Sequence, residues 1–230
     1  MPRESQAQRR ARAAAILGAL ARAYPDAHCE LAFSNPLELL VATILSAQCT
    51  DRQVNRVTAD LFLKYRTAAD YAAADPAVLE GDIRRIGLFR AKARNIRSCC
   101  QSLVERHAGE VPRTIDALTA LAGVGRKTAN VVLGNAFATN VGVVVDTHVQ
   151  RLHGRLRLGG GTTPEKIERE LMALFPAEHW AMLSHWLIWH GRRRCGARKP
   201  DCADCELGAL CPSAGKIGAF RGPSRESPGP

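Results

Sequence analysis

Four cysteines near the C-terminal end constrain this chain more than any other feature of the sequence. They follow one another at the spacing C-x6-C-x2-C-x5-C (Cys195, Cys202, Cys205 and Cys211), whereas the others are scattered (Cys29, Cys49, Cys99 and Cys100). Disulfide frameworks are typical of small secreted chains, so this crowding indicates a metal site. Four thiolates can hold a tetrahedral zinc ion or a [4Fe–4S] cluster. Zinc ribbons usually have two C-x2-C pairs and only one occurs here, so the spacing favours the cluster and leaves zinc as the alternative.

The composition is that of an ordinary soluble globular protein with an excess of positive charge. Of the 230 residues, 46% are hydrophobic and 23% charged, and the formal net charge is +10. This charge predicts a polyanionic partner or an acidic membrane surface. No run approaches the ~20 apolar residues that a membrane span needs. The basic and apolar N-terminal stretch has helical spacing and predicts an amphipathic helix, not a signal peptide. We therefore expect a cytoplasmic protein that does not enter a membrane.

The sequence predicts an all-α fold. Capping residues, several of them followed by proline, mark successive helix starts (Asn35-Pro36, Thr67, Asp75-Pro76, Thr114 and Thr163-Pro164). Apolar residues then recur at helical spacing in each segment. Only 141–145 has the composition of a strand, and it has no partner strand. The tail, 213–230, is rich in Gly, Pro and Ser, and we expect it to be disordered.

A glycine-framed turn, Gly123-Val124-Gly125, joins two predicted helices and is followed by Arg126. Turns of this kind leave backbone N–H groups pointing outward, and the positive end of the following helix adds to their attraction for anions. A tight turn with no ligand is the simpler interpretation of the glycines alone. Together with the net charge, the turn indicates a helix-hairpin-helix that grips a nucleic-acid backbone.

Lys127 and Asp146 are the candidate catalytic residues. Lys127 falls in the first turn of a helix, where the helix dipole, Arg126 and partial burial would all favour the uncharged, nucleophilic amine. Asp146 begins the phrase Asp146-Thr147-His148 and is a good helix N-cap whether or not it is catalytic. A carboxylate near an amine could deprotonate a nucleophile and stabilise positive charge at a sugar carbon. The loop 196–201 carries Arg198 and Lys199, which could reach a phosphate backbone.

Taken together, these residues resemble the endonuclease III family of DNA glycosylase/AP lyases, within the helix-hairpin-helix glycosylase superfamily. The resemblance extends from about residue 32 to residue 211. It rests on the cysteine spacing and on five phrases: LSAQCTD (45–51), IGLFRAKA (86–93), LAGVGRKTANVV (121–132), VDTHV (145–149) and HWLIWHGRRRC (185–195).

The resemblance implies a two-domain helix-hairpin-helix DNA glycosylase fold. Residues 29–139 would form a six-helix barrel that contains the helix-hairpin-helix at about 115–137. Residues 1–28 and 140–212 would form the domain of a [4Fe–4S] cluster held by the four cysteines. We expect a monomer whose partner is double-stranded DNA containing oxidised pyrimidines or abasic sites.

The resemblance also assigns roles to single residues. Lys127 would attack C1′ of a flipped-out oxidised pyrimidine nucleotide with help from Asp146, and β-elimination would then nick the strand. Gln48 matches the residue that fills the gap left by the base, and Leu88 matches the wedge in the opposite strand. His148 lies in the shared VDTHV phrase and is counted among the DNA contacts.

Two other functions were weighed against this one. A monofunctional adenine glycosylase of the same superfamily normally lacks a lysine at the position of Lys127 and carries a further C-terminal domain. A non-catalytic DNA-binding protein with a structural metal would have no use for Asp146 and Gln48 at the family's spacing. Lys127 therefore favours the bifunctional enzyme.

Overall fold

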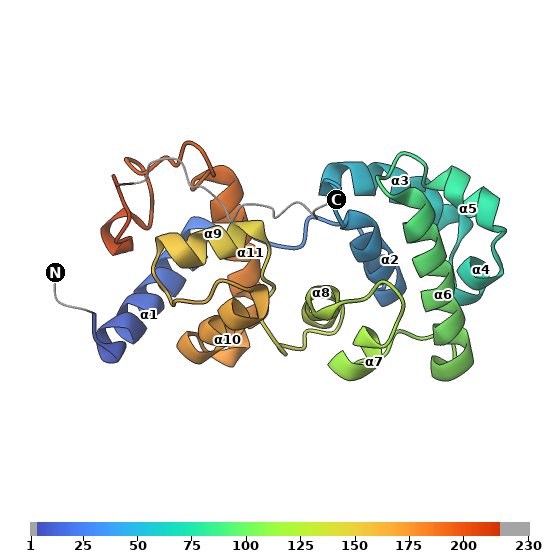
Figure 1. Cartoon of the computed structure of the whole chain (residues 1–230), viewed down its shortest axis with the longest axis horizontal. Coiled ribbons are helices and arrows are strands. Elements are labelled where there is room, and N and C mark those ends of the chain that lie inside the picture. Colours follow the sequence, from blue (N-terminus) through green and yellow to red (C-terminus); the bar gives the residue numbers. More distant parts are fainter. Residues whose placement is uncertain (1–3, 217–230) are drawn as a thin grey trace, which may run out of the picture. The chain divides into compact units, whose positions relative to one another are not determined.

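The computed structural model describes residues 4–216, and the regular secondary structure within them is helical (Figure 1). The helices are α1 (Gln6–Ala23), α2 (Pro36–Ser46), α3 (Asp51–Lys64), α4 (Ala68–Ala73), α5 (Pro76–Asp82), α6 (Phe89–His107), α7 (Ile115–Thr119), α8 (Arg126–Ala136), α9 (Thr147–Arg155), α10 (Pro164–Leu174) and α11 (Trp180–Arg193), with short 3-10 turns at Ala177–His179 and Gly208–Leu210. In this part of the chain the one bridge of β type joins Cys195 to Pro200, outside any strand. The predicted all-α fold is confirmed.

The predicted helix starts are confirmed in detail. Asn35 accepts a hydrogen bond from the Glu38 N–H at 2.9 Å, and Thr67 and Asp70 form a complete capping box. The carboxylate of Glu38 accepts a hydrogen bond from the Ser34 N–H at 2.6 Å, one residue before the cap. Each of these side chains satisfies N–H groups that the first helical turn leaves without a backbone partner.

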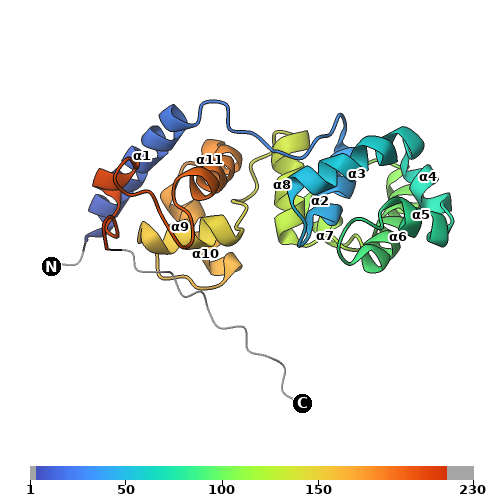
Figure 2. The same cartoon turned by 90° about the horizontal axis from the view of Figure 1, so that it is seen from above.

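Helices α2 to α8 form one compact unit, residues 28–142. Its core is built around α2, in which every residue from Leu39 to Leu45 is buried. A helix that is apolar on all sides must be surrounded by other helices, and α3, α6 and α8 pack against it. Helix α6 also lies along α4 and α5, as both views show (Figure 2).

The second compact unit combines the described residues up to Ala27 with those from Val143 onward. Its core is formed by the apolar faces of α1, α9, α10 and α11. Helix α1 packs against α11 and the turn Gly208–Leu210, so the first and last described segments lie side by side (Figures 1 and 2). Arg12 fastens them, since its guanidinium pairs with Glu4 and donates to the carbonyls of Leu156, at 2.7 Å, and Leu210.

Two segments need separate comment. Residues 141–145 form no strand, and the Val144 N–H donates instead to the Ser184 hydroxyl at 2.9 Å. Most of the predicted disordered tail lies outside the described residues, but 213–216 continue in turns, with the Ala214 N–H donating to the Cys211 carbonyl. Among residues 4–216, no helix combines the length and the apolar character that crossing a membrane requires.

Candidate catalytic and metal-binding residues

The glycine turn has the geometry that the sequence predicts, with one difference. Gly123 has a φ of +76°, and a Cβ on it would lie 2.9 Å from Cβ of Asn95, so only glycine fits. Gly125 has an ordinary φ of −92° and open space around it. The N–H groups of both glycines have no partner among the described residues, whereas the Val124 N–H donates to Leu121 and its side chain is buried. Val124 therefore anchors the turn and has no free N–H group to offer a ligand, contrary to our expectation.

Lys127 lies in the first turn of α8, beside this glycine turn. The helix begins at Gly125 without a side-chain cap, so its first N–H groups stay available, and the positive end of the helix faces outward here. The Lys127 side chain is exposed and has no polar partner within residues 4–216. The expected partial burial of Lys127 is therefore wrong, because the glycines and Arg126 that surround it are themselves exposed and provide no cover.

Gln48 and Leu88 share an unusual backbone conformation. Their φ angles are +55° and +58°, in the left-handed region that costs a residue with a Cβ about 1–2 kcal/mol. Both side chains are exposed, and Leu88 is 61% exposed, which is high for a leucine. Helix α6 begins at Leu88 without a side-chain cap. Strained and exposed residues of this kind are typical of functional sites.

Asp146 caps α9, as predicted. Its Oδ1 accepts hydrogen bonds from the N–H groups of His148, at 2.8 Å, and Val149, at 2.9 Å. Oδ2 has no protein partner in the described part of the chain, so one carboxylate oxygen remains available. Arg151 donates to Nδ1 of His148 at 3.1 Å, and burial lowers the pKa of His148. His148 is therefore neutral, with its proton on Nε2. Asp146 and His148 belong to a different unit from Lys127.

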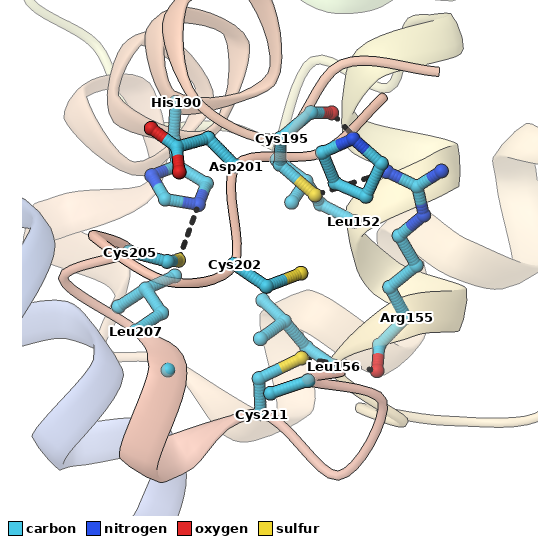
Figure 3. A pocket seen from close by; sticks show the side chains of 13 residues that line it. Leu152, Arg155, Leu156, His190, Cys195, Asp201, Cys202, Cys205, Leu207 and Cys211 are labelled. Atoms are coloured by element: carbon cyan, nitrogen blue, oxygen red, sulfur yellow. Dashed lines mark hydrogen bonds between the residues drawn. The ribbon is translucent and has the colours of Figure 1, made fainter. Parts of the chain in front are cut away.

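The four cysteines line one pocket, which encloses about 340 Å³, part of it open to solvent (Figure 3). Cys195 is buried and the other three are half-buried. Among residues 4–216, no three His, Cys, Asp or Glu side chains are already arranged to hold a single metal ion. The donor set nevertheless fits a metal cluster, since thiolates are the preferred ligands of iron–sulfur centres and of zinc. Burial raises the pKa of Cys205 and of Cys211, so bound metal would be needed to keep both as thiolates.

Two buried arginines that we did not single out from the sequence support the cysteine segment. Arg155 donates to Sγ of Cys195 at 3.1 Å and to the carbonyls of Gly196 and Ala197, each at 2.8 Å. Arg151 donates to the carbonyls of Gly191 and Cys195. Their four-residue spacing places both on one face of α9. That spacing was visible in the sequence, but it could not distinguish a buried face from a solvated one.

His190 and Tyr24 complete the surroundings of the pocket. The Tyr24 hydroxyl lies 2.9 Å from Nδ1 of His190. Nε2 of His190 lies 3.6 Å from Sγ of Cys205 (Figure 3). Burial lowers the pKa of His190 to about 4, so the ring is neutral. When Cys205 is a thiolate, only the tautomer with its proton on Nε2 can bond both neighbours.

Arg198 and Lys199 are exposed at the tip of the loop between Cys195 and Cys202. The base of this loop is held by Arg194, which pairs with Asp201 and, at 3.1 Å, with Glu206. Both loop cations therefore point their charge into solvent from a fixed base.

Comparison with models of protein families matches residues 41–177 to the HhH-GPD superfamily base excision DNA repair proteins. The chain is 50% identical to endonuclease III of Synechocystis sp. over 208 residues, which cover 90% of this chain and 95% of that protein. It is 48% identical to endonuclease III of Bacillus subtilis, over 82% of this chain and 86% of that protein.

A solved structure with the same architecture is described as a trapped endonuclease III–DNA covalent intermediate. The TM-score is 0.85 and the sequence identity 47%, over 89% of this chain and 96% of that one. A similarity that covers 89% of this chain extends into both compact units.

The two glycines of the turn provide a test of its geometry. Gly123→Ala should lower the free energy of unfolding by about 1–2 kcal/mol from the positive φ alone, and further because Asn95 must move. Gly125→Ala should change it by less than about 0.5 kcal/mol, since the added methyl group meets no atom. Urea unfolding followed by circular dichroism measures both, and equal destabilisation by the two substitutions would contradict the structure.

Proposed function

This chain belongs to the endonuclease III family of bifunctional DNA glycosylase/AP lyases of base excision repair, and on that premise we propose that Lys127 is its nucleophile. The substrate is an oxidised pyrimidine nucleotide in double-stranded DNA, flipped out of the helix, or an abasic site. The observation that carries the proposal is the exposed, unpartnered amine of Lys127 beside the glycine turn. Family membership leaves no place for a non-catalytic DNA-binding protein, and it favours a lyase over the monofunctional adenine glycosylase.

The other lysines of the family-matched region suit the role less well. Lys64 is paired with Asp82 at 2.7 Å, and Lys92 is buried with its amine bonded to two carbonyls. Lys166 is exposed in the first turn of α10, but that helix start is already capped, since the Thr163 hydroxyl accepts from the Lys166 N–H. A related protein has been trapped as a covalent complex with DNA, and such a step requires a protein nucleophile. Lys127 is the lysine that combines access with an anion-attracting helix start.

The proposed reaction removes the base first and cleaves the strand afterwards. Nζ of Lys127 forms a bond to C1′ while the N-glycosidic bond breaks, and the base leaves with the electron pair and takes up a proton. The sugar ring then opens to a Schiff base between Nζ and C1′. Loss of a proton from C2′ expels the 3′ phosphate by β-elimination, which nicks the strand, and hydrolysis of the Schiff base releases Lys127.

Asp146 assists the first step in this proposal. Because Oδ1 is occupied by two N–H groups of α9, the carboxylate is held in one orientation, and Oδ2 remains for catalysis. A carboxylate in this state can accept the amine proton or stabilise the positive charge that develops at C1′. Asp146 thus combines a structural and a catalytic role on different oxygen atoms.

We assign the remaining residues to DNA contact. The N–H groups of Gly123 and Gly125, the start of α8 and Arg126 would hold backbone phosphate, which positions DNA without reading its sequence. Gln48 would fill the gap left by the flipped base, and Leu88 would enter the opposite strand. His148, Arg198 and Lys199 would make further contacts. The left-handed backbone of Gln48 and Leu88 supports their assignment.

The four cysteines are assigned to a [4Fe–4S] cluster, held beside Arg155 and His190. Such a cluster would bring segments of the chain together around one centre. On this assignment residues 28–142 are the barrel domain, and the described residues on either side of them form the cluster domain. We place the protein in the cytoplasm because its proposed substrate is chromosomal DNA. We also propose that it acts as a monomer.

The nucleophile can be tested by trapping the Schiff base. Wild-type protein incubated with a duplex containing thymine glycol and treated with borohydride should form a covalent protein–DNA adduct. Lys127→Gln should form none, because the amide cannot make an imine, and the exposed position should leave the melting temperature unchanged. Denaturing gel electrophoresis measures the adduct. Lys166→Gln is the matched control and should react like wild type. An adduct in Lys127→Gln would contradict the assignment.

Two substitutions separate the roles of Asp146. Asp146→Asn should retain the helix cap and the stability but lose at least about tenfold in single-turnover base removal, since the carboxylate charge is gone. Asp146→Ala should lose the same activity and also about 1 kcal/mol of unfolding free energy. Thermal melts and single-turnover kinetics measure the two effects. Full activity in Asp146→Asn would limit Asp146 to capping.

The cluster can be tested on the purified protein. We expect a brown preparation with broad visible absorption and equal amounts of iron and acid-labile sulfide. Cys202→Ser should lose most of the absorption because a thiolate ligand is removed. Cys99→Ser, in the core of the other unit, should keep the absorption in whatever fraction of the protein folds. A colourless preparation that contains zinc would instead support the zinc alternative.

A further inference from the structure

One face of helix α6 contacts both loops proposed to enter the DNA and also the glycine turn. Leu88 immediately precedes the helix, and Lys92 and Asn95 follow it at steps of four and three residues, which places them on the same face. Lys92 bonds the segment that leads into Gln48. Asn95 contacts Gly123 so closely that no side chain fits there. The first two turns of α6 therefore follow directly on the Leu88 loop and contact the Gln48 segment and the glycine turn, which lie far from α6 in the sequence.

Lys92 is unusual because it is only 4% exposed, and among the described residues no other lysine is buried. Its Nζ donates to the carbonyl of Leu45 at 2.9 Å and to the carbonyl of Ala47 at 2.6 Å. Helix α2 ends at Ser46, so these carbonyls belong to its last turn and to the residue before Gln48. A positive charge is stabilised at this end of a helix, and burial lowers the pKa of Lys92.

The same two loops are joined at a second point. The side chain of Gln53, in the first turn of α3, donates from Nε2 to the carbonyl of Arg85 at 3.4 Å. Arg85 lies three residues before Leu88, and Gln53 lies five residues after Gln48. Lys92 thus joins the residues before Gln48 to those after Leu88, and Gln53 joins the residues after Gln48 to those before Leu88.

We propose that Lys92 is a positioning residue that holds the Gln48 and Leu88 loops in a fixed relation, so that both side chains enter the damaged duplex together. The proposal rests on the DNA-inserting roles proposed for Gln48 and Leu88. This role of Lys92 differs from simple helix capping because its amine, in α6, bonds a loop that lies about 45 residues earlier in the chain. Without Lys92 the carbonyls of Leu45 and Ala47 lose their donor, and the backbone of Gln48 is free to leave its left-handed conformation.

The proposal can be tested with two substrates that differ in their need for insertion. One is a duplex containing thymine glycol, where the base must be flipped and the gap filled. The other is a single-stranded oligonucleotide with a preformed abasic site, which has neither a base to flip nor an opposite strand. Lys92→Met should remove the base from the duplex roughly 10- to 100-fold more slowly than wild type. Its strand cleavage at the single-stranded site should stay within about twofold of wild type.

A fluorescent base provides a readout that does not depend on catalysis. 2-Aminopurine placed opposite a stable abasic analogue in the duplex should brighten when wild-type protein binds, because insertion unstacks it. Lys92→Met should bind the duplex with a smaller increase in fluorescence at saturation. Lys92→Arg, which keeps the charge and the donors, should recover part of the increase and part of the duplex rate.

Leu103→Ala is the control for general destabilisation. Leu103 lies in the same helix and is fully buried, but it is three turns beyond Lys92 and far from both loops. Its substitution should lower the melting temperature and leave the ratio of the duplex and single-strand rates unchanged. If Lys92→Met does not fold, the same ratio of duplex rate to single-strand rate is measured for Lys92→Arg. We expect that ratio to lie below the wild-type value.

The outcomes separate this proposal from the proposed function. Equal losses on the two substrates, or no loss on either, in the folded Lys92 variant would overturn the positioning role. Wild-type protein that forms no Schiff base with either substrate would overturn the function itself, and the positioning role with it.

Discussion

The burial of α2 from Leu39 to Leu45 is the constraint on which the unit 28–142 depends. Because these residues are buried and all but Thr43 are apolar, the surrounding helices must enclose them, and the C-terminal carbonyls of the helix cannot all turn to water. Lys92 supplies donors to two carbonyls at that end, from a helix whose other contacts include the glycine turn. The enclosure of one apolar helix thereby determines where Gln48, Leu88 and Gly123 are presented.

In the other unit, two buried arginines of α9 lie beside the apolar core. Arg151 and Arg155 contribute guanidinium groups to a region of backbone carbonyls and thiols, where they satisfy the turn after Cys195. A charge of this kind is costly to bury unless its donors are used. The cysteine thiolates proposed as metal ligands would place negative charge beside these arginines. The C-terminal segment has little apolar surface of its own, so such polar contacts and a bound metal cluster would stabilise it.

Two α-helices begin without a side-chain cap and without a preceding helical turn, α6 at Leu88 and α8 at Gly125. Both of these helix starts are assigned to DNA contact. Every other α-helix of the described residues except α11, which continues from a 3-10 turn, has a Ser, Thr, Asn or Asp side chain that accepts from its first N–H groups. An open helix start and a left-handed residue each cost stability, of the order of 1 kcal/mol. The protein retains both features at the surface where a polyanion would offset the cost. Asp146 also combines a structural with a functional role, since one carboxylate oxygen caps α9 and the other remains available.

Local features were predictable from the sequence because they depend on neighbours within a few residues. The helix caps, the need for glycine at a turn, the capping role of Asp146 and the grouping of the four cysteines are of this kind. The exposure of Lys127, the hydrogen bond made by the Val124 N–H and the burial of Arg151 and Arg155 were not. Only the tertiary structure decided that Lys92 is a buried donor while Lys127 is an exposed amine, because burial of a long cationic side chain depends on carbonyls brought to it from distant segments.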